Sequence, residues 1–202
     1  MVLGIVFIAY SYKVTHAHKA PLAVLGNPGH RVGPFSFTNQ EGKTITNEDV
    51  KGKIYVAEYF FATCRGICPK MNENMVKVFQ AFRGSKDVLI LSHTVDPRKD
   101  SVAALKTYSL KYDADPHQWL FLTGDKKELY DMARYSYLVT AADDTAVVDI
   151  KSDFIHTQYW VLVDDGGRLR GKFYDGTNPG DVNQLIGDIK QLLEEKETDA
   201  KH

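Results

Sequence analysis

The chain has 202 residues, of which 44% are hydrophobic, 25% charged and 11% aromatic. This length predicts one domain with appendages, and the composition supports a normal core without disulfide cross-links. The net charge of -1 and the lack of a dense Lys/Arg stripe argue against a nucleic-acid-binding protein. Two cysteines are too few for a disulfide scaffold or for a zinc site made of cysteine alone.

The first ten residues, MVLGIVFIAY, are all apolar or small. They supply about half of the ~20 residues that span a bilayer, and no basic residue precedes them as in a secretory signal. One interpretation is a buried or frayed terminus. We favour the other, in which residues 1–12 are the end of a membrane anchor whose first residues lie upstream. Residues 13–32 are rich in Pro and Gly, which is typical of a linker.

Apolar alternation predicts a short β-hairpin from residues 35–38 and 44–46, followed by one capped helical turn. Four later segments have the apolar, β-branched and aromatic composition of central strands: 54–61, 87–95, 119–122 and 159–163. Four segments have apolar residues at helical spacing: 69–83, 101–112, 126–137 and 182–193. The turn Asp164–Gly167 predicts a hairpin that leads into a strand at 168–174.

This order of strands and helices predicts an α/β fold with a mixed central sheet and helices on both faces. The layout is that of a thioredoxin-like fold with an N-terminal β-hairpin extension. We expect the folded domain to cover residues 33–193. Residues 194–202 are polar, and we expect them to form a frayed tail.

The only two cysteines, Cys64 and Cys68, lie between the predicted strand 54–61 and the predicted helix 69–83. Open α/β sheets place their functional sites at the carboxyl ends of central strands. At a helix N-terminus the unpaired N–H groups and the dipole favour thiolate over thiol. Because the thiolate is both the nucleophile and the metal ligand, this loop is the candidate functional site.

Several chemistries are compatible with the cysteine pair. The two side chains could be inert core residues or a structural disulfide, although they flank an exposed-looking Arg65-Gly66. They could form a thiol-disulfide oxidoreductase, for which Cys-x-x-Cys is the usual spacing. Three intervening residues leave more room for an ion, and soft thiolates suit Cu(I). A thiol peroxidase ranks last, because no Thr-Pro pattern precedes Cys64.

A copper site that also holds Cu(II) needs an imidazole from elsewhere in the chain. Five of the seven histidines stand in the expected tether, linker, polar loop or tail: His16, His18, His30, His117 and His202. His93 lies inside a predicted strand, where we expect a packed histidine that could act as an outer group of the site. His156 precedes the strand 159–163. If that strand neighbours 54–61, His156 lies at the mouth of the cysteine loop.

Residues 60–71, FFATCRGICPKM, resemble the Cys-x-x-x-Cys-Pro signature of the Sco/SenC family of copper chaperones. Residues 94–101 and 121–124 resemble the second and third blocks of that family. His156 stands where the family carries its ligand histidine. The similarity covers roughly residues 33–193.

The resemblance implies a thioredoxin-like domain anchored in a membrane and facing the periplasm or another extracytoplasmic side. It implies one copper ion, Cu(I) and/or Cu(II), bound by Cys64, Cys68 and His156. Family members help to assemble the binuclear copper centre of cytochrome c oxidase, by delivering copper to the copper-centre subunit, by reducing its cysteines, or both. We expect a monomeric metallochaperone. The alternative is an oxidoreductase that cycles a Cys64–Cys68 disulfide without a stable metal.

Four further residues are candidates for contacts around the site: Asp96, Asp100, Asp153 and His93. The family commonly has Asp directly before its histidine, whereas this chain has Ile155 there and Asp153 three residues before the histidine. Asp96 and Asp100 could cap the cysteine loop and adjust its electrostatics. They could equally cap the helix that begins near Ser101.

Overall fold

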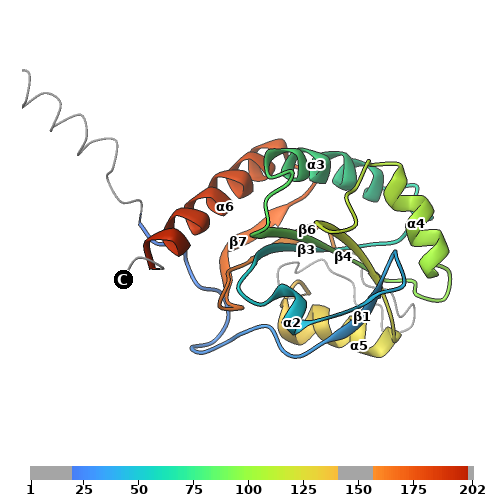
Figure 1. The fold of residues 1–202 in the computed structure, drawn as a ribbon, viewed down its shortest axis with the longest axis horizontal. Helices are drawn as coiled ribbons and strands as arrows, with labels where there is room; N and C mark the ends of the chain where they lie inside the picture. Colours follow the sequence, from blue (N-terminus) through green and yellow to red (C-terminus); the bar gives the residue numbers. More distant parts are fainter. Residues whose placement is uncertain (1–19, 141–156, 200–202) are drawn as a thin grey trace, which may run out of the picture.

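A computed structural model describes residues 20–140 and 157–199 (Figure 1). The strands are β1 (Ser36–Asn39), β2 (Thr44–Thr46), β3 (Ile54–Phe60), β4 (Val88–Thr94), β5 (Trp119–Thr123), β6 (Tyr159–Val163) and β7 (Leu169–Asp175). The helices are α2 (Asn47–Val50), α3 (Cys68–Ala81), α4 (Val102–Leu110), α5 (Lys126–Asp131), the π-helical η1 (Met132–Ser136) and α6 (Pro179–Asp199).

All seven strands belong to one mixed sheet in the order β2-β1-β5-β4-β3-β6-β7. The central strands β3, β4 and β5 run parallel, so their carboxyl ends meet at the same edge of the sheet. The outer strands β1, β6 and β7 pair antiparallel with their neighbours. The antiparallel pairing of β6 with β3 confirms the predicted neighbourhood of these two strands.

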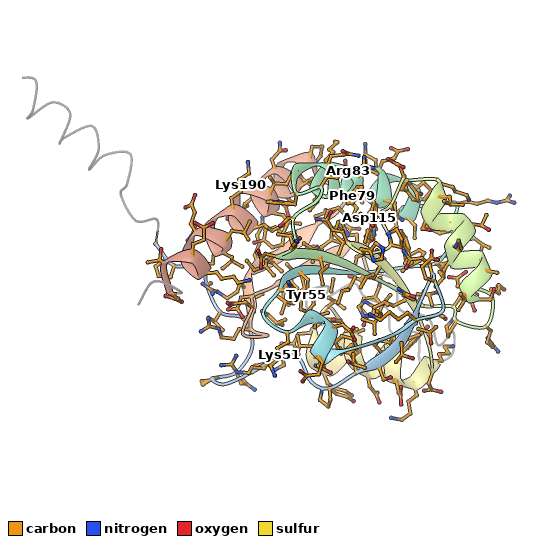
Figure 2. The ribbon with its side chains drawn as sticks, in the orientation of Figure 1. Lys51, Tyr55, Phe79, Arg83, Asp115 and Lys190 are labelled. Carbon is orange, nitrogen blue, oxygen red and sulfur yellow. The ribbon has the colours of Figure 1, made fainter. Side chains whose placement is uncertain are left out.

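Helices cover both faces of this sheet, with α3, α4 and α6 on one side and α2 and α5 on the other (Figure 1). The two-residue period of β3 divides its side chains between two cores. Val56 and Phe60 pack under α3, α4 and α6, whereas Tyr55 and Tyr59 pack on the side of α5. Figure 2 shows Phe79 of α3 and Tyr55 on opposite sides of the sheet. The predicted thioredoxin-like α/β fold and its β1–β2 hairpin are confirmed.

The end of the chain differs from the expected frayed tail at 194–202, because α6 continues into it. Glu195 binds Arg170 at 3.1 Å, and Lys196 binds Asp87 at 2.5 Å. Since Arg170 and Asp87 belong to the folded core and its edge, these ion pairs hold the last turns of α6 against the domain.

The second half of the expected linker also differs from the prediction. The backbone N–H of Leu25 donates to Leu169 at 2.9 Å, and that of Gly171 donates to Ala23 at 2.8 Å. Because β7 is an edge strand with unpaired backbone groups, an extended segment beside it satisfies them. Residues 20–32 are therefore part of the folded unit.

The predicted helix 126–137 is divided into two parts. After α5 the backbone widens into η1, where Tyr137 donates its N–H to the carbonyl of Met132, five residues earlier, at 2.9 Å. This wider turn buries Tyr137 in the core on the α5 side of the sheet.

Within the part of the chain that the structure describes, no helix combines the length and hydropathy needed to cross a membrane.

Candidate copper and thiol site

The cysteine loop, residues 61–68, connects β3 to α3 at the carboxyl end of β3. The loop begins with a turn in which the N–H of Cys64 donates to Phe61 O at 3.1 Å. Cys68 is the first residue of α3, and Pro69 follows it, where its fixed φ and missing N–H suit the first helical turn. Cys64 is half-buried and Cys68 is buried, with 5% of its surface exposed; both are free thiols.

Both cysteines open onto one cavity of about 20 Å³. Its walls come from four parts of the chain, namely the end of β3, the cysteine loop, the residue after β4 and the residue two places before β6. The lining residues are Tyr59, Phe60, Phe61, Cys64, Ile67, Cys68, Val95 and Thr157. This volume is near the minimum that holds one water molecule. The space therefore suits a single atom or ion between the sulfurs rather than an organic substrate.

The electrostatics of Cys68 contradict the expected effect of the helix N-terminus. Burial, and then the neighbouring Cys64 thiol, raise the pKa of Cys68 to about 12, against a lowering effect from the Phe61 backbone. The negative charge of Glu58 acts in the same direction as burial. Desolvation therefore outweighs the helix dipole, and Cys68 is a neutral thiol at pH 7.

Asp100 supports the start of the cysteine loop and does not cap α4. Its Oδ2 accepts the N–H of Ala62 at 3.1 Å and the hydroxyl of Thr94 at 2.5 Å. Burial raises the pKa of this carboxyl. The cap of α4 is Ser101, whose hydroxyl accepts the N–H of Ala104.

Asp96 lies in the same loop after β4 and is also buried. Its N–H donates to the hydroxyl of Thr94 at 3.0 Å, and its carboxylate pairs with Lys99 at 3.2 Å. Asp96 therefore stabilises the loop that supports the cysteines. It does not line the cysteine cavity.

His93 is fully buried on the α5 side of the sheet and is absent from the cavity wall. Its ring stacks on Tyr59 with centroids 5.1 Å apart, and Tyr59 does line the cavity. Burial lowers the pKa of His93 to about 4. The backbone of Glu58 and Leu91 favours the charged ring, but neither ring nitrogen reaches hydrogen-bond geometry with a described residue.

The expected ligand His156 and the expected neighbour Asp153 lie outside the described residues. Among residues 20–140 and 157–199, no three His, Cys, Asp or Glu side chains gather closely enough to hold a metal ion. The site in this part of the chain therefore consists of the two thiols and their apolar cavity.

The family described as SCO1/SenC matches residues 25–194, which include the cysteine loop and the whole sheet. The chain belongs to the SCO1/SenC family. The family resemblance carried by the sequence motifs is confirmed.

Three solved structures of SCO1/SenC proteins are similar to this chain. A SCO1/SenC family lipoprotein from Bacillus anthracis str. Ames is 29% identical with a TM-score of 0.70, over 85% of this chain and 99% of that one. BsSco, described with a disulfide switch and as a member of the Sco family of cytochrome c oxidase assembly proteins, is 30% identical with a TM-score of 0.68, over 86% and 96%. ScoI of Bradyrhizobium japonicum, solved with copper bound, is 27% identical with a TM-score of 0.62, over 80% and 99%.

Sequence reasoning on this SCO1/SenC member overlooked Glu58, a carboxyl with no exposed surface on β3. The hydroxyl of Ser92 donates to its Oε1 at 2.5 Å, and the indole N–H of Trp119 donates to Ser92 at 2.8 Å. Burial raises the pKa of Glu58 to about 7, against the lowering effect of Ser92 and Trp160. The available signal was one acidic residue inside the apolar run 54–61.

Proposed function

We propose that this SCO1/SenC protein binds one copper ion through Cys64, Cys68 and His156 and delivers it to, or reduces the cysteines of, the binuclear copper site of cytochrome c oxidase. The observation that carries the proposal is the shared cavity of the two cysteines and Thr157. Thr157 directly follows His156 in the sequence, and this adjacency supports His156 as the third ligand.

The chemistry of the described donors fits copper. Two sulfur ligands select Cu(I), and an added imidazole also suits Cu(II). The cavity walls are mainly aromatic and aliphatic, and such an apolar shell limits solvent access to a bound metal. Because thiols must lose their protons to bind a metal, copper binding should weaken as the pH falls.

The relatives support both parts of this proposal. ScoI of Bradyrhizobium japonicum was solved with copper bound, and BsSco is described as a cytochrome c oxidase assembly protein. Both are more than a quarter identical to this chain and share its fold. We infer copper binding and the role in oxidase assembly from this similarity and from the presence of Cys64 and Cys68 in this chain.

A second candidate function is thiol-disulfide exchange by the same pair. The thiols of Cys64 and Cys68 line one cavity, and the neighbouring Cys64 thiol raises the pKa of Cys68. A disulfide switch is described for BsSco. Oxidation of the pair removes both thiolates and so releases copper. The redox state of the pair would then control delivery.

We also infer that residues 1–12 tether a monomeric domain to a membrane on its extracytoplasmic side. The apolar sequence of residues 1–10 supports this location, and so does the description of the Bacillus anthracis relative as a lipoprotein. Washing of cell membranes at high salt tests the tether. The full chain should stay with the membranes, and a chain that begins at residue 20 should be released.

Titration of the purified reduced chain with copper tests the ligand set. We expect one equivalent to bind, with sulfur-to-copper charge-transfer absorption for Cu(II), and we expect Cys64→Ser and Cys68→Ser to abolish both. His156→Ala should change the spectrum and weaken binding. The matched control is His117→Ala, because His117 is exposed and does not line the cavity. If His156→Ala leaves both spectrum and affinity unchanged, the third ligand is wrong.

A further inference from the structure

Exposed cations stand beside the cysteine cavity. Residues 61–70, which form the cysteine loop and the start of α3, carry two of them, and the loop between β4 and α4, residues 95–101, carries two more. We call this set the basic rim; its members are Arg65, Lys70, Arg98 and Lys99. The same two segments contain two acids, Asp96 and Asp100, and both are buried. Every exposed charged side chain of these segments is therefore positive.

The two segments are joined next to the cavity. Val95 donates its N–H to Phe60 O at 2.9 Å, and Asp100 accepts the N–H of Ala62 at 3.1 Å. Val95 also lines the cavity together with both cysteines. Because these contacts hold the segments side by side, the basic rim belongs to the same edge of the sheet as the thiols.

Three members of the basic rim have no partner charge. Lys99 pairs with Asp96 at 3.2 Å, whereas Arg65, Lys70 and Arg98 form no ion pair or hydrogen bond within the described part of the chain. The whole chain has 25 basic and 26 acidic side chains, so a surface of ordinary composition would carry both signs here. The unpaired positive charge therefore creates a local potential that attracts negative groups toward the thiols.

An exposed apolar side chain accompanies these cations. Ile67 stands between the two cysteines in the sequence, lines their cavity, and has 40% of its surface exposed. The half-buried Cys64 lines the same cavity. Protein interfaces commonly combine an apolar centre with a polar rim, and they are enriched in arginine. The surface beside the thiols therefore has the composition of a docking site for another polypeptide.

From this arrangement we propose that the basic rim docks an acidic polypeptide surface and brings it to Cys64 and Cys68. The inference rests on the proposed function, because it names the chemistry of the partner that meets the cysteine pair. Complementary charge accelerates the encounter and selects the partner, and exposed rim charges act mainly in this way. The partner is thus recognised by carboxylates around the group that exchanges copper or a disulfide.

The other end of the domain carries the opposite charge. Lys196 of α6 donates to the carbonyl of Gly52, just before β3, at 2.7 Å, so the last turns of α6 lie at the amino end of β3. The seven residues of β3 separate this end from the cysteine loop by ~20 Å. Residues 188–199 of α6 carry more acids than lysines, namely Asp188, Glu194, Glu195, Glu197 and Asp199 against Lys190 and Lys196.

The chain enters the described fold beside this acidic end. Gln191 of α6 donates to the carbonyl of Ala20 at 2.8 Å, and Figure 1 shows the segment that begins at residue 20 next to the end of α6. The proposed tether therefore starts beside the acidic end, and the basic rim lies at the far end of β3. This placement favours a polypeptide over the lipid surface as the partner of the rim.

NMR titration of the reduced chain tests the surface directly. The probes are two synthetic peptides of equal length without cysteine, one rich in Glu and one rich in Lys. At low ionic strength the Glu-rich peptide should shift the backbone amide signals of the cysteine loop and of residues 95–101, and the Lys-rich peptide should not. In ~0.5 M NaCl the shifts should disappear, because salt screens exposed charges. Shifts confined to other parts of the chain, or equal shifts with both peptides, would overturn the proposal.

A triple variant separates the basic rim from the net charge of the chain. Combining Arg65→Gln, Lys70→Gln and Arg98→Gln should weaken binding of the Glu-rich peptide ~10-fold or more. The matched control changes the net charge equally through three other exposed lysines and should bind the peptide as the wild-type chain does; it combines Lys51→Gln, Lys86→Gln and Lys190→Gln. Figure 2 shows Lys51 and Lys190 on the outside of the domain. Equal losses in the two triple variants would overturn the proposal.

Thiol exchange shows whether docking reaches Cys64. Each peptide now carries one cysteine as a mixed disulfide with nitrothiobenzoate. The Cys64 thiolate attacks the peptide sulfur, and nitrothiobenzoate leaves as a coloured thiolate with the electron pair. At low ionic strength the Glu-rich peptide should react ~10-fold faster than the Lys-rich one, and this ratio should approach one in the rim variant. The ratio cancels any change in the thiol itself, so equal rates in the wild-type chain would overturn the proposal.

Lipid vesicles test the other anionic partner, a membrane. The extra binding to phosphatidylglycerol vesicles over phosphatidylcholine vesicles should be the same for the wild-type chain and the rim variant. If the rim variant loses this extra binding while its response to the Glu-rich peptide is unchanged, the rim contacts lipid and the proposal is overturned.

The docking surface and the proposed function can fail separately. None of these measurements contains copper, and the NMR titration needs no thiol exchange. A chain that neither binds copper nor exchanges thiols can therefore still confirm the docking surface. A chain that binds copper but responds equally to both peptides keeps the proposed function and loses only this inference.

Discussion

Asp100 accepts the backbone N–H of Ala62 at 3.1 Å and so joins the loop after β4 to the start of the cysteine loop, 38 residues earlier in the chain. The same oxygen also accepts the hydroxyl of Thr94 at 2.5 Å. The cysteine loop is therefore held by a tertiary contact as well as by its own turn. A change at Asp100 should reach the cysteines through Ala62.

We predict that Asp100→Ala lowers the free energy of unfolding by about 2 kcal/mol, because it leaves the buried hydroxyl of Thr94 and the partly buried N–H of Ala62 without their acceptor. Asp100→Asn should cost much less. Its amide oxygen can accept both hydrogen bonds, and it removes a charge that burial disfavours, as the raised pKa indicates. Urea denaturation of the two variants measures the difference. Equal losses would show that the charge, not the acceptor oxygen, holds the loop.

Glu58 and His93 should affect stability in opposite directions with pH. The pKa of Glu58 is raised from 4.5 to about 7, so its contribution to the free energy of unfolding falls as the pH rises through this window. The pKa of His93 is lowered from 6.5 to about 4, so its contribution rises with pH between these values. Each shift corresponds to about 3 kcal/mol.

Between pH 4.5 and 6.5 the two contributions oppose each other, and the wild-type stability should change little. Glu58→Gln should then gain stability as the pH rises across this range, and His93→Phe should lose it. Phe keeps an aromatic ring against Tyr59, which limits the packing loss. Urea denaturation at several pH values gives the slopes. If the free energy of unfolding changed with pH in the same direction in both variants, the opposite pKa shifts of Glu58 and His93 would be contradicted.

The parts of the fold that follow from local sequence patterns were predictable. The four apolar segments became the strands β3, β4, β5 and β6, and the cysteines lie at the carboxyl end of β3 as expected. Hydrophobic periodicity decides such elements before any tertiary contact exists. The family assignment rested on the same local motifs, and the match to residues 25–194 confirms it.

The parts that depend on partners distant in the chain were not predictable. The thiol of Cys68 was expected to be acidified by its helix, but burial raises its pKa. That burial depends on the end of β3, Val95 and Thr157, which are distant in the sequence and together form the cavity wall. In the sequence, Glu58 is only one acidic residue in an apolar run. Its buried hydrogen-bond network with Ser92 and Trp119 is seen only in the structure. Sequence spacing gives no measure of such packing.

The last turns of α6 also depend on residues distant in the chain, and this dependence leads to a testable prediction. Lys196 binds Asp87 at 2.5 Å and the carbonyl of Gly52 at 2.7 Å, so a polar segment stays helical by contacts outside itself. We expect Lys196→Met to lower the free energy of unfolding by about 1 kcal/mol. Lys190→Met is the matched control, because Lys190 is exposed on the outer side of α6 (Figure 2). Equal stability of the two variants would show that these contacts contribute nothing.

The two thiols should differ in their reactivity toward alkylation. Cys64 is half-buried, whereas Cys68 is 5% exposed and its pKa is raised to about 12, so Cys68 holds little thiolate at pH 8. Since the thiolate is the reactive form, we predict that iodoacetamide modifies Cys68 ~10-fold more slowly than Cys64, or slower still. Mass spectrometry of the peptides after timed quenching gives both rates. In urea the two rates should converge, because burial is lost. If Cys68 reacts first in the folded chain, the raised pKa of Cys68 is wrong.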